Sequence, residues 1–274
     1  MKSIKLVAFD LDGTLLREDK TIPEENLEAL KAARDAGIVI APATGRLMDN
    51  MPEEIAELCR YFILINGAAV YDRAEDRYFG EAVIDTDLAM EIYGIADTLP
   101  CLYDAYLDYH GYMTESMHAR LEEYMPNKAY ARTMTAHRKP VPDLKKHILE
   151  TGASVQKIQW YFKSPAERDE WTERLNTRFA GRIYASHSLN YNIEINSAEA
   201  VKGRGLEKLC AYLGITPEDC IAFGDGTNDL SLIERAGIGV CMKNGADECK
   251  AVADVISGKS NDEAGFAAEL LARI

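Results

Sequence analysis

Short apolar runs alternate with helical patterns along the first part of the chain. Strands are predicted over Ile4–Phe9, Ile38–Ile40 and Tyr61–Ile65, where apolar residues follow one another almost without interruption. Between the first two, Pro23–Ala36 carries apolar residues on one side and is followed by Gly37, which predicts a helix and its end. Nearly continuous apolar strands separated by helices are typical of parallel β-α units.

The pattern changes over residues 85–185. Helical stretches there are longer and more polar, tyrosine is more frequent, and a hairpin is predicted to turn near His110-Gly111. A strand over Val155–Phe162 is followed by Ser164–Glu167, which combines capping-box spacing with proline at the first helical position and predicts a helix through Phe179. This segment is expected to form an α+β unit of its own.

The alternation of strands and helices resumes at Tyr191. A strand to Ile195, a helix over Gly203–Gly214 and a strand that ends at Gly224 are predicted, and a final helix begins near Asn261. The chain is therefore predicted to be an α/β protein with a parallel sheet and two domains: a discontinuous core of residues 1–84 and 186–274, and an inserted α+β domain of residues 85–185.

The composition agrees with a folded chain of this size and narrows its partners. The 274 residues suffice for two domains, and 47% hydrophobic and 28% charged residues are ordinary for a globular protein. The formal net charge of -14 disfavours nucleic acid and anionic membranes as partners, because clustered lysine and arginine bind both. An anionic substrate would need a local cation to overcome this charge.

The six cysteines form no C-x-x-C pair and have no histidine at ligand spacing. They are interpreted as small buried hydrophobic residues in a reducing compartment. Asp10 and Asp12 interrupt the first apolar segment well short of a signal peptide or a membrane span. A cytoplasmic location is therefore expected.

Acidic residues and glycines follow two of the predicted strands. Asp10-Leu11-Asp12-Gly13-Thr14 comes directly after the first strand, and Gly224-Asp225-Gly226-Thr227-Asn228-Asp229 follows the apolar Cys220–Phe223. Open α/β sheets bind ligands at the carboxyl ends of their strands, so the two segments predict one shared site. Four carboxylates there would repel one another unless a cation were present, and Mg²⁺ prefers such oxygen ligands.

Two further segments could complete an anion site, although each has a structural reading as well. Thr44-Gly45-Arg46 follows another strand, and Lys202 precedes a predicted helix. Taken alone, the first acidic segment could be a turn with a helix cap, Thr44-Gly45-Arg46 a loop, Lys202 a surface lysine and Asp229 a helix N-terminal charge. The order of all four segments favours a common site.

In this order the four segments resemble the four motifs of the haloacid dehalogenase-like (HAD) superfamily of phosphohydrolases. More narrowly, the chain is similar to the Cof-type subfamily, because of Asn66-Gly67-Ala68, Gly239–Gly245 and Asn261–Glu263. The resemblance implies a Rossmann-like core with an inserted α+β cap of the C2 type. Over the middle segment it depends on length and placement only.

The resemblance also implies a reaction and a role for each motif residue. Asp10 would be the nucleophile that forms an aspartyl-phosphate, and Asp12 the general acid and base. The phosphate would be held by the backbone of Leu11 and by Thr44, Gly45, Lys202 and Asn228. Mg²⁺ would be held by Asp10, the backbone carbonyl of Asp12 and Asp225, with Asp229 orienting the other ligands.

The implied activity is Mg²⁺-dependent hydrolysis of a small phosphorylated metabolite, with sugar phosphates as the commonest class. A phosphotransferase or mutase using the same phosphoaspartate is an alternative, as is a phosphatase of pyridoxal phosphate or flavin mononucleotide. A non-catalytic binder is disfavoured because both Asp10 and Asp12 are present. A monomer is favoured over a dimer, since the cap must be free to move.

The sequence leaves the roles of several residues open. Gly226 and Lys243 stand where many relatives carry asparagine and a small residue, and neither change removes a ligand. Arg46 could contact the substrate or form a structural ion pair. Tyrosines and a histidine of the middle segment could contact the leaving group, but core or surface positions are their simpler reading: Tyr103, Tyr106, Tyr109, Tyr112, Tyr124 and His110.

Overall fold

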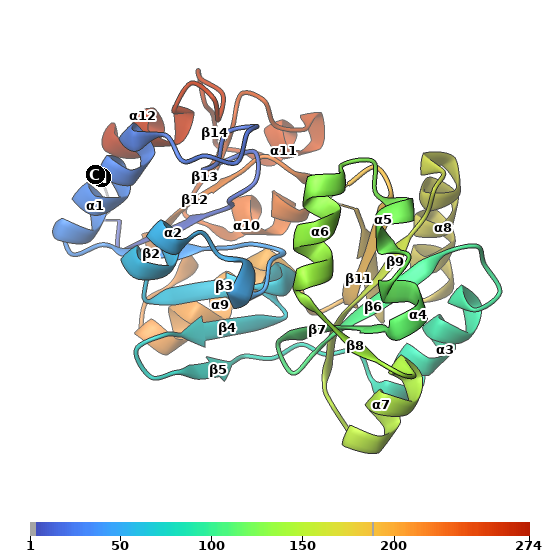
Figure 1. The fold of residues 1–274 in the computed structure, drawn as a ribbon. Helices are drawn as coiled ribbons and strands as arrows, with labels where there is room; N and C mark the ends of the chain where they lie inside the picture. The colour runs from blue at the N-terminus through green and yellow to red at the C-terminus, as the bar shows by residue number, and fades with distance from the viewer. Residues whose placement is uncertain (1–3, 188) are drawn as a thin grey trace. The chain divides into compact units, whose positions relative to one another are not determined.

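The computed structural model describes residues 4–187 and 189–274, apart from the side chains of residues 129 and 130. The first three residues of the predicted core and Ser188 therefore lie outside the described residues. The chain divides into two compact units (Figure 1). The first unit comprises Met1–Arg46, Met51–Glu81 and Val201–Ile274, and the second comprises Leu47–Asn50 and Ala82–Ala200.

The first unit is built on a five-stranded parallel sheet. Its strands follow the order β14 (Val255–Ile256), β13 (Ile238–Cys241), β12 (Cys220–Gly224), β1 (Leu6–Phe9) and β2 (Val39–Pro42). The central pair, β1 and β12, runs in parallel register from Leu6 opposite Cys220 to Phe9 opposite Phe223. The two acidic segments therefore leave neighbouring strands at the same edge of the sheet, and the predicted α/β fold is confirmed.

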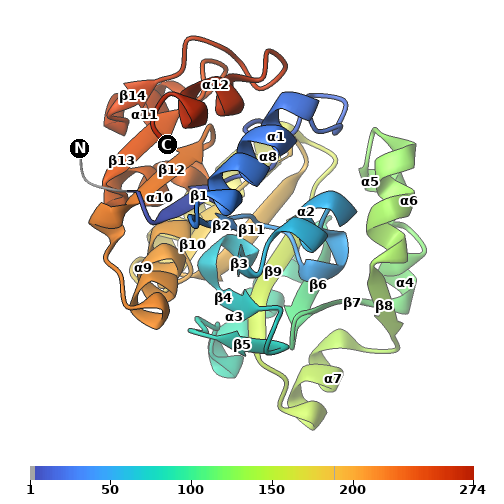
Figure 2. The ribbon, with the colours of Figure 1, turned by 90° about the vertical axis from the view of Figure 1, so that its left-hand side faces the viewer.

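Helices cover both faces of this sheet, as Figure 2 shows. On one face, Leu6 and Ala8 pack with leucines of α9 (Lys202–Leu213) and α10 (Leu230–Arg235). On the other, Phe9 contacts Phe266 of α12 (Gly265–Leu271), with ring centroids 5.5 Å apart, and α1 (Glu24–Asp35) packs against α12. Burial of both faces explains why the strands are almost continuously apolar.

Shorter elements complete the first unit. They are α2 (Glu53–Leu58), α11 (Asp247–Val252), the 3-10 turns η2 (Ile65–Gly67), η3 (Pro217–Asp219) and η4 (Thr227–Asp229), and an antiparallel sheet of β3 (Tyr61–Leu64), β4 (Ala69–Asp72) and β5 (Arg77–Phe79). The predicted parallel strand β3 belongs to this small sheet and meets the segment after β2 through one parallel bridge, between Ala43 and Ile63.

The last helix begins at Gly265, later than the predicted start near Asn261. Asn261 is held in turns instead: its side-chain amide donates to the carbonyl of Leu16, and its backbone N–H donates to the side chain of Asn244. Ala264, which precedes the helix, has a left-handed backbone with φ +55°.

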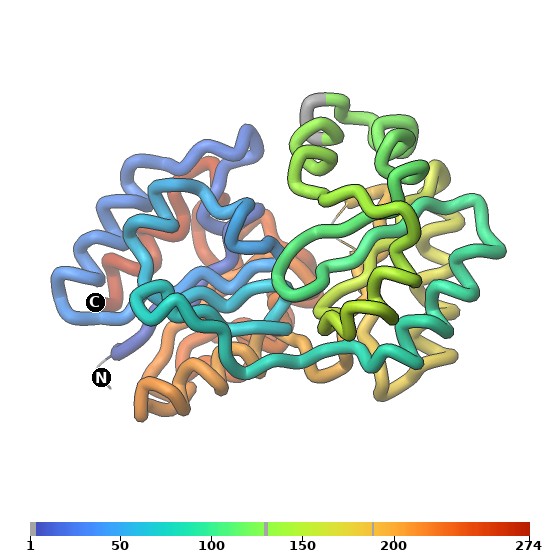
Figure 3. Tube along the Cα trace, turned by 60° about the horizontal axis from the view of Figure 1, so that its bottom comes forward, coloured from blue at the N-terminus to red at the C-terminus, as the bar shows by residue number. Residues whose placement is uncertain are grey.

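The second unit contains a six-stranded sheet. The order is β10 (Ile183–Ser186), β11 (Asn192–Ser197), β9 (Val155–Tyr161), β6 (Leu102–Leu107), β7 (His110–Thr114) and β8 (Arg138–Val141), antiparallel except for β7 with β8. Its core lies under α3 (Thr86–Ala96), α7 (Leu144–Thr151) and α8 (Pro165–Arg178). The remaining helical segments are η1 (Met48–Asn50), α4 (Glu115–His118), α5 (Leu121–Tyr124) and α6 (Lys128–Ala136), and Figure 3 shows α4, α5 and α6 gathered at one side of this unit.

The structure of this unit confirms the helix predicted from its capping residues and the predicted hairpin. The side chain of Ser164 accepts from the N–H of Glu167, and α8 ends at Arg178 with Phe179 as its C-cap. The hairpin turns at Asp108 and Tyr109, just before the predicted position His110-Gly111. Asp108 has φ +45° and Tyr109 has φ +67°.

The prediction that the strand after Tyr191 belongs to the parallel sheet of the core is wrong. Asn192–Ser197 lies antiparallel between β9 and β10, so the second unit extends to Ala200 and not to residue 185. Ile193 and Ile195 of this strand face the helix-covered core, while its alternate residues are polar. That period of two is typical of an antiparallel strand with one polar face.

Within the described residues, every helix is too short or too polar to cross a bilayer.

Candidate active site

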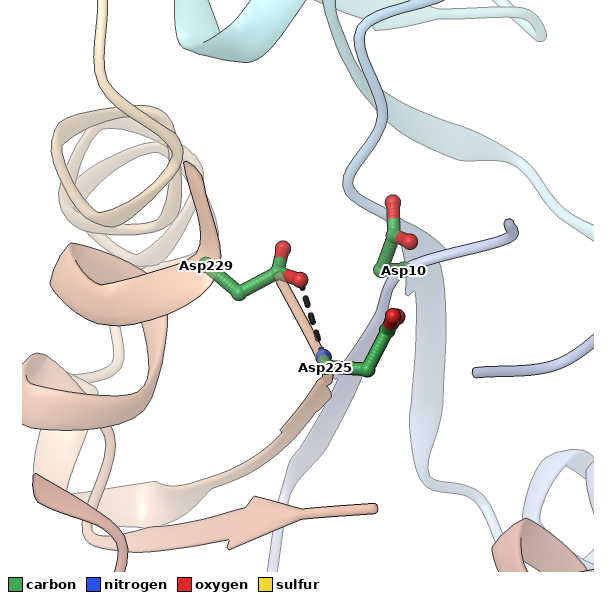
Figure 4. Close-up of side chains that lie close together, drawn as sticks. All are labelled: Asp10, Asp225 and Asp229. Atoms are coloured by element: carbon green, nitrogen blue, oxygen red, sulfur yellow. Dashed lines mark hydrogen bonds between the residues drawn. The ribbon is translucent and has the colours of Figure 1, made fainter. Parts of the chain in front are cut away.

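Three carboxylates converge at the carboxyl edge of the parallel sheet (Figure 4). Asp10 follows β1, Asp225 follows β12 and Asp229 closes the turn η4; one carboxylate oxygen of each lies within 4.8 Å of the others. Asp229 is oriented by two backbone donors, since its Oδ2 accepts from the N–H groups of Asp225 at 3.0 Å and Gly226 at 2.9 Å. The structure thus brings together three of the four predicted acids.

Lys202 places a buried positive charge among these acids. It is the first residue of α9, and its Nζ lies 2.6 Å from Oδ1 of Asp10 and 2.6 Å from Oδ1 of Asp229. Burial opposes the charged form of this lysine, but the two carboxylates outweigh it and raise the pKa of Lys202 above its usual value. The alternative of a surface lysine is therefore wrong, because the side chain is fully buried.

One ammonium group does not balance three clustered carboxylates, of which Asp10 and Asp229 are buried and Asp225 is partly buried. Burial, with the neighbouring acids adding to it and Lys202 opposing it, raises the pKa of Asp10 well above its ordinary range. Burial and the charge of Asp229 raise the pKa of Asp225 to about 7. These carboxyl groups are costly to ionise unless a further cation is present. Their oxygens are the ligands that a hard divalent ion such as Mg²⁺ prefers. The residues present therefore fit the predicted metal.

The fourth acid, Asp12, has a separate environment. Arg46 binds its carboxylate with two donors, Nε to Oδ2 at 2.9 Å and Nη2 to Oδ1 at 2.7 Å, and Nζ of Lys20 lies 2.8 Å from Oδ1. Burial raises the pKa of Asp12, but Arg46 and Lys20 outweigh burial and lower it overall. Arg46 thus forms an ion pair with Asp12, which is one of its two predicted roles, and contact with the substrate stays a prediction. Nothing in the sequence singled out Lys20, which lies outside the four motifs.

The glycine and threonine after Asp12 shape the pocket around Asp225. Gly13 has φ +86°, and a Cβ added there would lie 2.3 Å from Oδ2 of Asp225. The hydroxyl of the fully buried Thr14 donates to Oδ1 of Asp225 at 2.8 Å. Thr14 is a further residue of the site that was not assigned from the sequence, although it stands in the first motif. Leu11 contributes a carbonyl that accepts from the N–H groups of Leu15 and Leu16.

The expected phosphate-holding residues border the same region. Thr44 is buried, and its Oγ1 accepts from the N–H of Arg46 at 3.2 Å. The side-chain amide of Asn228 donates to Oδ1 of Asn66 at 3.3 Å, and a Cβ on Gly45 would lie 3.0 Å from the same oxygen. In the sequence, Asn66 is recognisable only as part of the segment Asn66-Gly67-Ala68 that is similar to the Cof-type subfamily. Its burial and its contact with Asn228 place it in this region.

Comparison with known proteins agrees with this geometry. The family model described as haloacid dehalogenase-like hydrolase matches residues 7–270. A 5-amino-6-(5-phospho-D-ribitylamino)uracil phosphatase, YwtE of Bacillus subtilis (strain 168), is 31% identical over 287 residues, which covers 96% of this chain and 96% of that protein. The pyridoxal phosphate phosphatase YbhA of Escherichia coli (strain K12) is 25% identical, covering 94% and 95% of the two chains.

Solved structures show the same architecture. A haloacid dehalogenase-like hydrolase from B. subtilis superposes with a TM-score of 0.83 and 26% identity, covering 99% of this chain and 100% of that one. A HAD subclass IIB sugar phosphatase, at 20% identity and a TM-score of 0.79, covers 98% of each chain and supports the fold. The chain belongs to the haloacid dehalogenase-like hydrolase family, in its Cof-type subfamily, and is a phosphatase of small phosphorylated molecules.

Proposed function

We propose that this phosphatase hydrolyses a small phosphomonoester, a sugar phosphate as the first choice, with Mg²⁺ and through an aspartyl-phosphate on Asp10. The observation that supports this most directly is the contact of Lys202 with both Asp10 and Asp229 beside Asp225. This contact supports the proposal because it joins the proposed nucleophile to a fixed cation, with further carboxylate oxygens beside them. Such a group of charges can bind and stabilise a transferring phosphoryl group.

Two displacements account for the reaction. In the first, a carboxylate oxygen of Asp10 attacks phosphorus, the bond to the leaving oxygen breaks, and Asp12 gives that oxygen its proton. In the second, water attacks the same phosphorus, Asp12 takes the proton from the water, and the bond between phosphorus and Asp10 breaks. Inorganic phosphate leaves and the carboxylate of Asp10 is restored.

Arg46 and Lys20 bear on the role of Asp12. Their ion pairs favour the ionised carboxylate, which is the form that accepts a proton from water in the second displacement. To donate a proton in the first, the carboxyl group of Asp12 must leave these pairs. A good leaving group, which needs no proton, should therefore depend less on Asp12 than an alkyl leaving group does.

The metal would be held by Asp10, Asp225 and the backbone carbonyl of Asp12, with Asp229 orienting the others. When bound, Mg²⁺ offsets negative charge on the phosphoryl group. The phosphate itself would be held by Thr44, Gly45, Lys202, Asn228 and the backbone of Leu11.

We further propose that the second unit is the cap that selects the leaving group, with Ala82–Ala200 as its main segment.

We also propose that the protein is a monomer located in the cytoplasm. All six cysteines are free and buried, which suits a reducing compartment.

The experiment is a phosphate-release assay on a panel of phosphomonoesters with Mg²⁺. We expect Asp10→Asn to abolish release, because the amide is a poor nucleophile, and excess chelator to do the same. Asp35→Asn is the matched control, since Asp35 is exposed at the end of α1 and pairs with Arg34. Activity of Asp10→Asn equal to that of the unmodified enzyme would refute the mechanism.

The panel also separates the alternatives. A phosphotransferase or mutase releases little phosphate without an acceptor hydroxyl, whereas a phosphatase releases one phosphate for each substrate consumed. Preference for pyridoxal phosphate, flavin mononucleotide or a phosphorylated ribitylaminouracil over sugar phosphates would replace the first choice of substrate and keep the reaction.

A further inference from the structure

The turn that follows β3 has an unusual backbone. Ile65, Asn66 and Gly67 have φ values of +53°, +57° and +88°. Glycine and asparagine adopt the left-handed region readily, but a β-branched isoleucine rarely does. Strained positions of this kind persist where the surrounding structure holds them, and they cluster at functional sites.

The segment after β2 holds one side of this turn. The N–H of Ile65 donates to the carbonyl of Arg46 at 3.2 Å, and the N–H of Asn66 donates to the carbonyl of Thr44 at 2.9 Å. On the other side, a Cβ added to Gly67 would lie 2.3 Å from the carbonyl oxygen of Val201, the residue before Lys202. The turn therefore lies between two segments that carry expected phosphate-holding residues.

The side chain of Asn66 reaches a third such segment. It is only 5% exposed, and its Oδ1 accepts from Nδ2 of Asn228 at 3.3 Å. Gly45 passes so close that an added Cβ would lie 3.0 Å from this oxygen. One buried amide thus contacts Asn228 and borders Gly45, while its backbone binds Thr44.

We propose that Asn66 is a positioning residue of the phosphate site. Its carbonyl oxygen binds one N–H of the Asn228 amide, which orients that amide and leaves the second N–H to donate to a phosphate oxygen. Its backbone keeps the Thr44–Arg46 segment at the correct distance from η4. The inference rests on the proposed function, because it assigns Asn228 and Thr44 to the substrate phosphate.

Asn66→Gly is the informative variant. Glycine adopts the observed φ without strain, so the backbone of the turn is kept while the contact with Asn228 is lost. We expect phosphate binding to weaken about tenfold, the scale of one lost hydrogen bond to a charged group. The measurements are the inhibition constant for inorganic phosphate, KM and kcat for one phosphomonoester, and calorimetric binding of inorganic phosphate with Mg²⁺ present.

Asn26→Ala is the matched control for loss of a buried amide. Asn26 is fully buried in the same unit, donates to the carbonyl of Leu15 at 2.9 Å and accepts from the N–H of Ala267 at 3.1 Å. Its loss should lower the unfolding temperature and leave phosphate binding unchanged. A purely structural role for Asn66 would give the same result as this control.

A double-mutant cycle tests the proposed route through Asn228. If Asn66 acts by orienting that amide, Asn66→Gly should weaken phosphate binding much less in an Asn228→Ala background than alone. Unchanged phosphate binding in Asn66→Gly, or fully additive losses in the double variant, would overturn the inference. Absence of phosphate release by the unmodified enzyme would instead refute the proposed function, and calorimetry would still report whether Asn66 affects phosphate binding.

Discussion

Burial and neighbouring charges together give the chemically identical carboxyl groups of Asp10, Asp12 and Asp225 different pKa values. Burial, and the negative charge of the neighbouring Asp229, raise the pKa of Asp225 to about 7. Asp12 meets Arg46 and Lys20, which lower its pKa. The sequence predicts that these acids approach one another. Which of them has a raised pKa and which a lowered one depends on Lys20 and on the direction of each side chain. Neither follows from spacing along the chain.

Asp72 shows the same principle outside the site and leads to a pH-dependent prediction. Its buried carboxylate accepts from Nε and Nη2 of Arg60, both at 2.8 Å, from the hydroxyl of Tyr212 at 3.1 Å, and from the N–H of Ala74. The hydrogen bonds from Arg60 are the main cause of its lowered pKa. At neutral pH, Asp72→Asn should reduce the free energy of unfolding by about 1 to 3 kcal/mol.

The sign of the pH effect follows from the lowered pKa. The stabilisation by ionised Asp72 is fully present above the pKa of the unfolded chain, about 4, and is lost as the pH falls through the lower folded value. Urea unfolding of both proteins between pH 7 and pH 3 should therefore show curves that converge in acid. A difference that stays constant over this range would contradict the assignment.

At the scale of elements, the start of α9 brings Lys202 to the acids. A Cβ on Gly203 would lie 2.0 Å from the carbonyl oxygen of Ser231 in α10, and a Cβ on Gly205 would lie 2.4 Å from Cγ2 of Ile63. The two glycines let α9 pack closely on α10 and on β3. Gly203-Arg204-Gly205 is predictable as the beginning of a helix, but the contacts that require glycine there come from elements far away in the sequence.

Gly203→Ala should therefore affect both stability and activity. The added methyl group must push α9 away from α10, which we expect to lower the free energy of unfolding by about 1 to 3 kcal/mol and to displace Lys202 from Asp10. Gly94→Ala is the matched control. Gly94 lies in α3 with open space around the added Cβ, so the same substitution should be neutral or stabilising by up to about 1 kcal/mol. Equal effects of the two substitutions would argue against a packing role for Gly203.

At the scale of the whole molecule, prediction from sequence depended on how local the determining signal was. The parallel strands and α8 follow from apolar runs and a cap within a few residues. The strand Asn192–Ser197 lies in a different sheet from the one that its position in the sequence predicts, because its apolar residues suit either sheet and only its partner strands decide. The left-handed turn at Ile65 is a conformation that an isoleucine rarely adopts, so no residue preference could have indicated it.

The division into two units leads to a prediction about specificity. Residues 82–200 leave and rejoin the first unit near one place, since Gly80 lies against Lys208 of α9 and Val201 immediately precedes that helix. Seven helical steps separate Val201 from Lys208, which is about 10 Å at 1.5 Å per residue. A flexible linker of about six residues can span this distance. The first unit can therefore be joined without Ala82–Ala200, the main segment of the second unit, while Leu47–Asn50 stays in the chain.

The shortened protein should fold around the parallel sheet, whose described core comes from the first unit alone. It should still hydrolyse a small aryl phosphate with Mg²⁺, because Asp10, Asp12, Lys202 and Asp225 are all retained. If the second unit selects the leaving group, differences in kcat/KM among sugar phosphates and pyridoxal phosphate should shrink by about 10- to 100-fold. A shortened protein with the substrate ranking of the full chain would place specificity in the first unit instead.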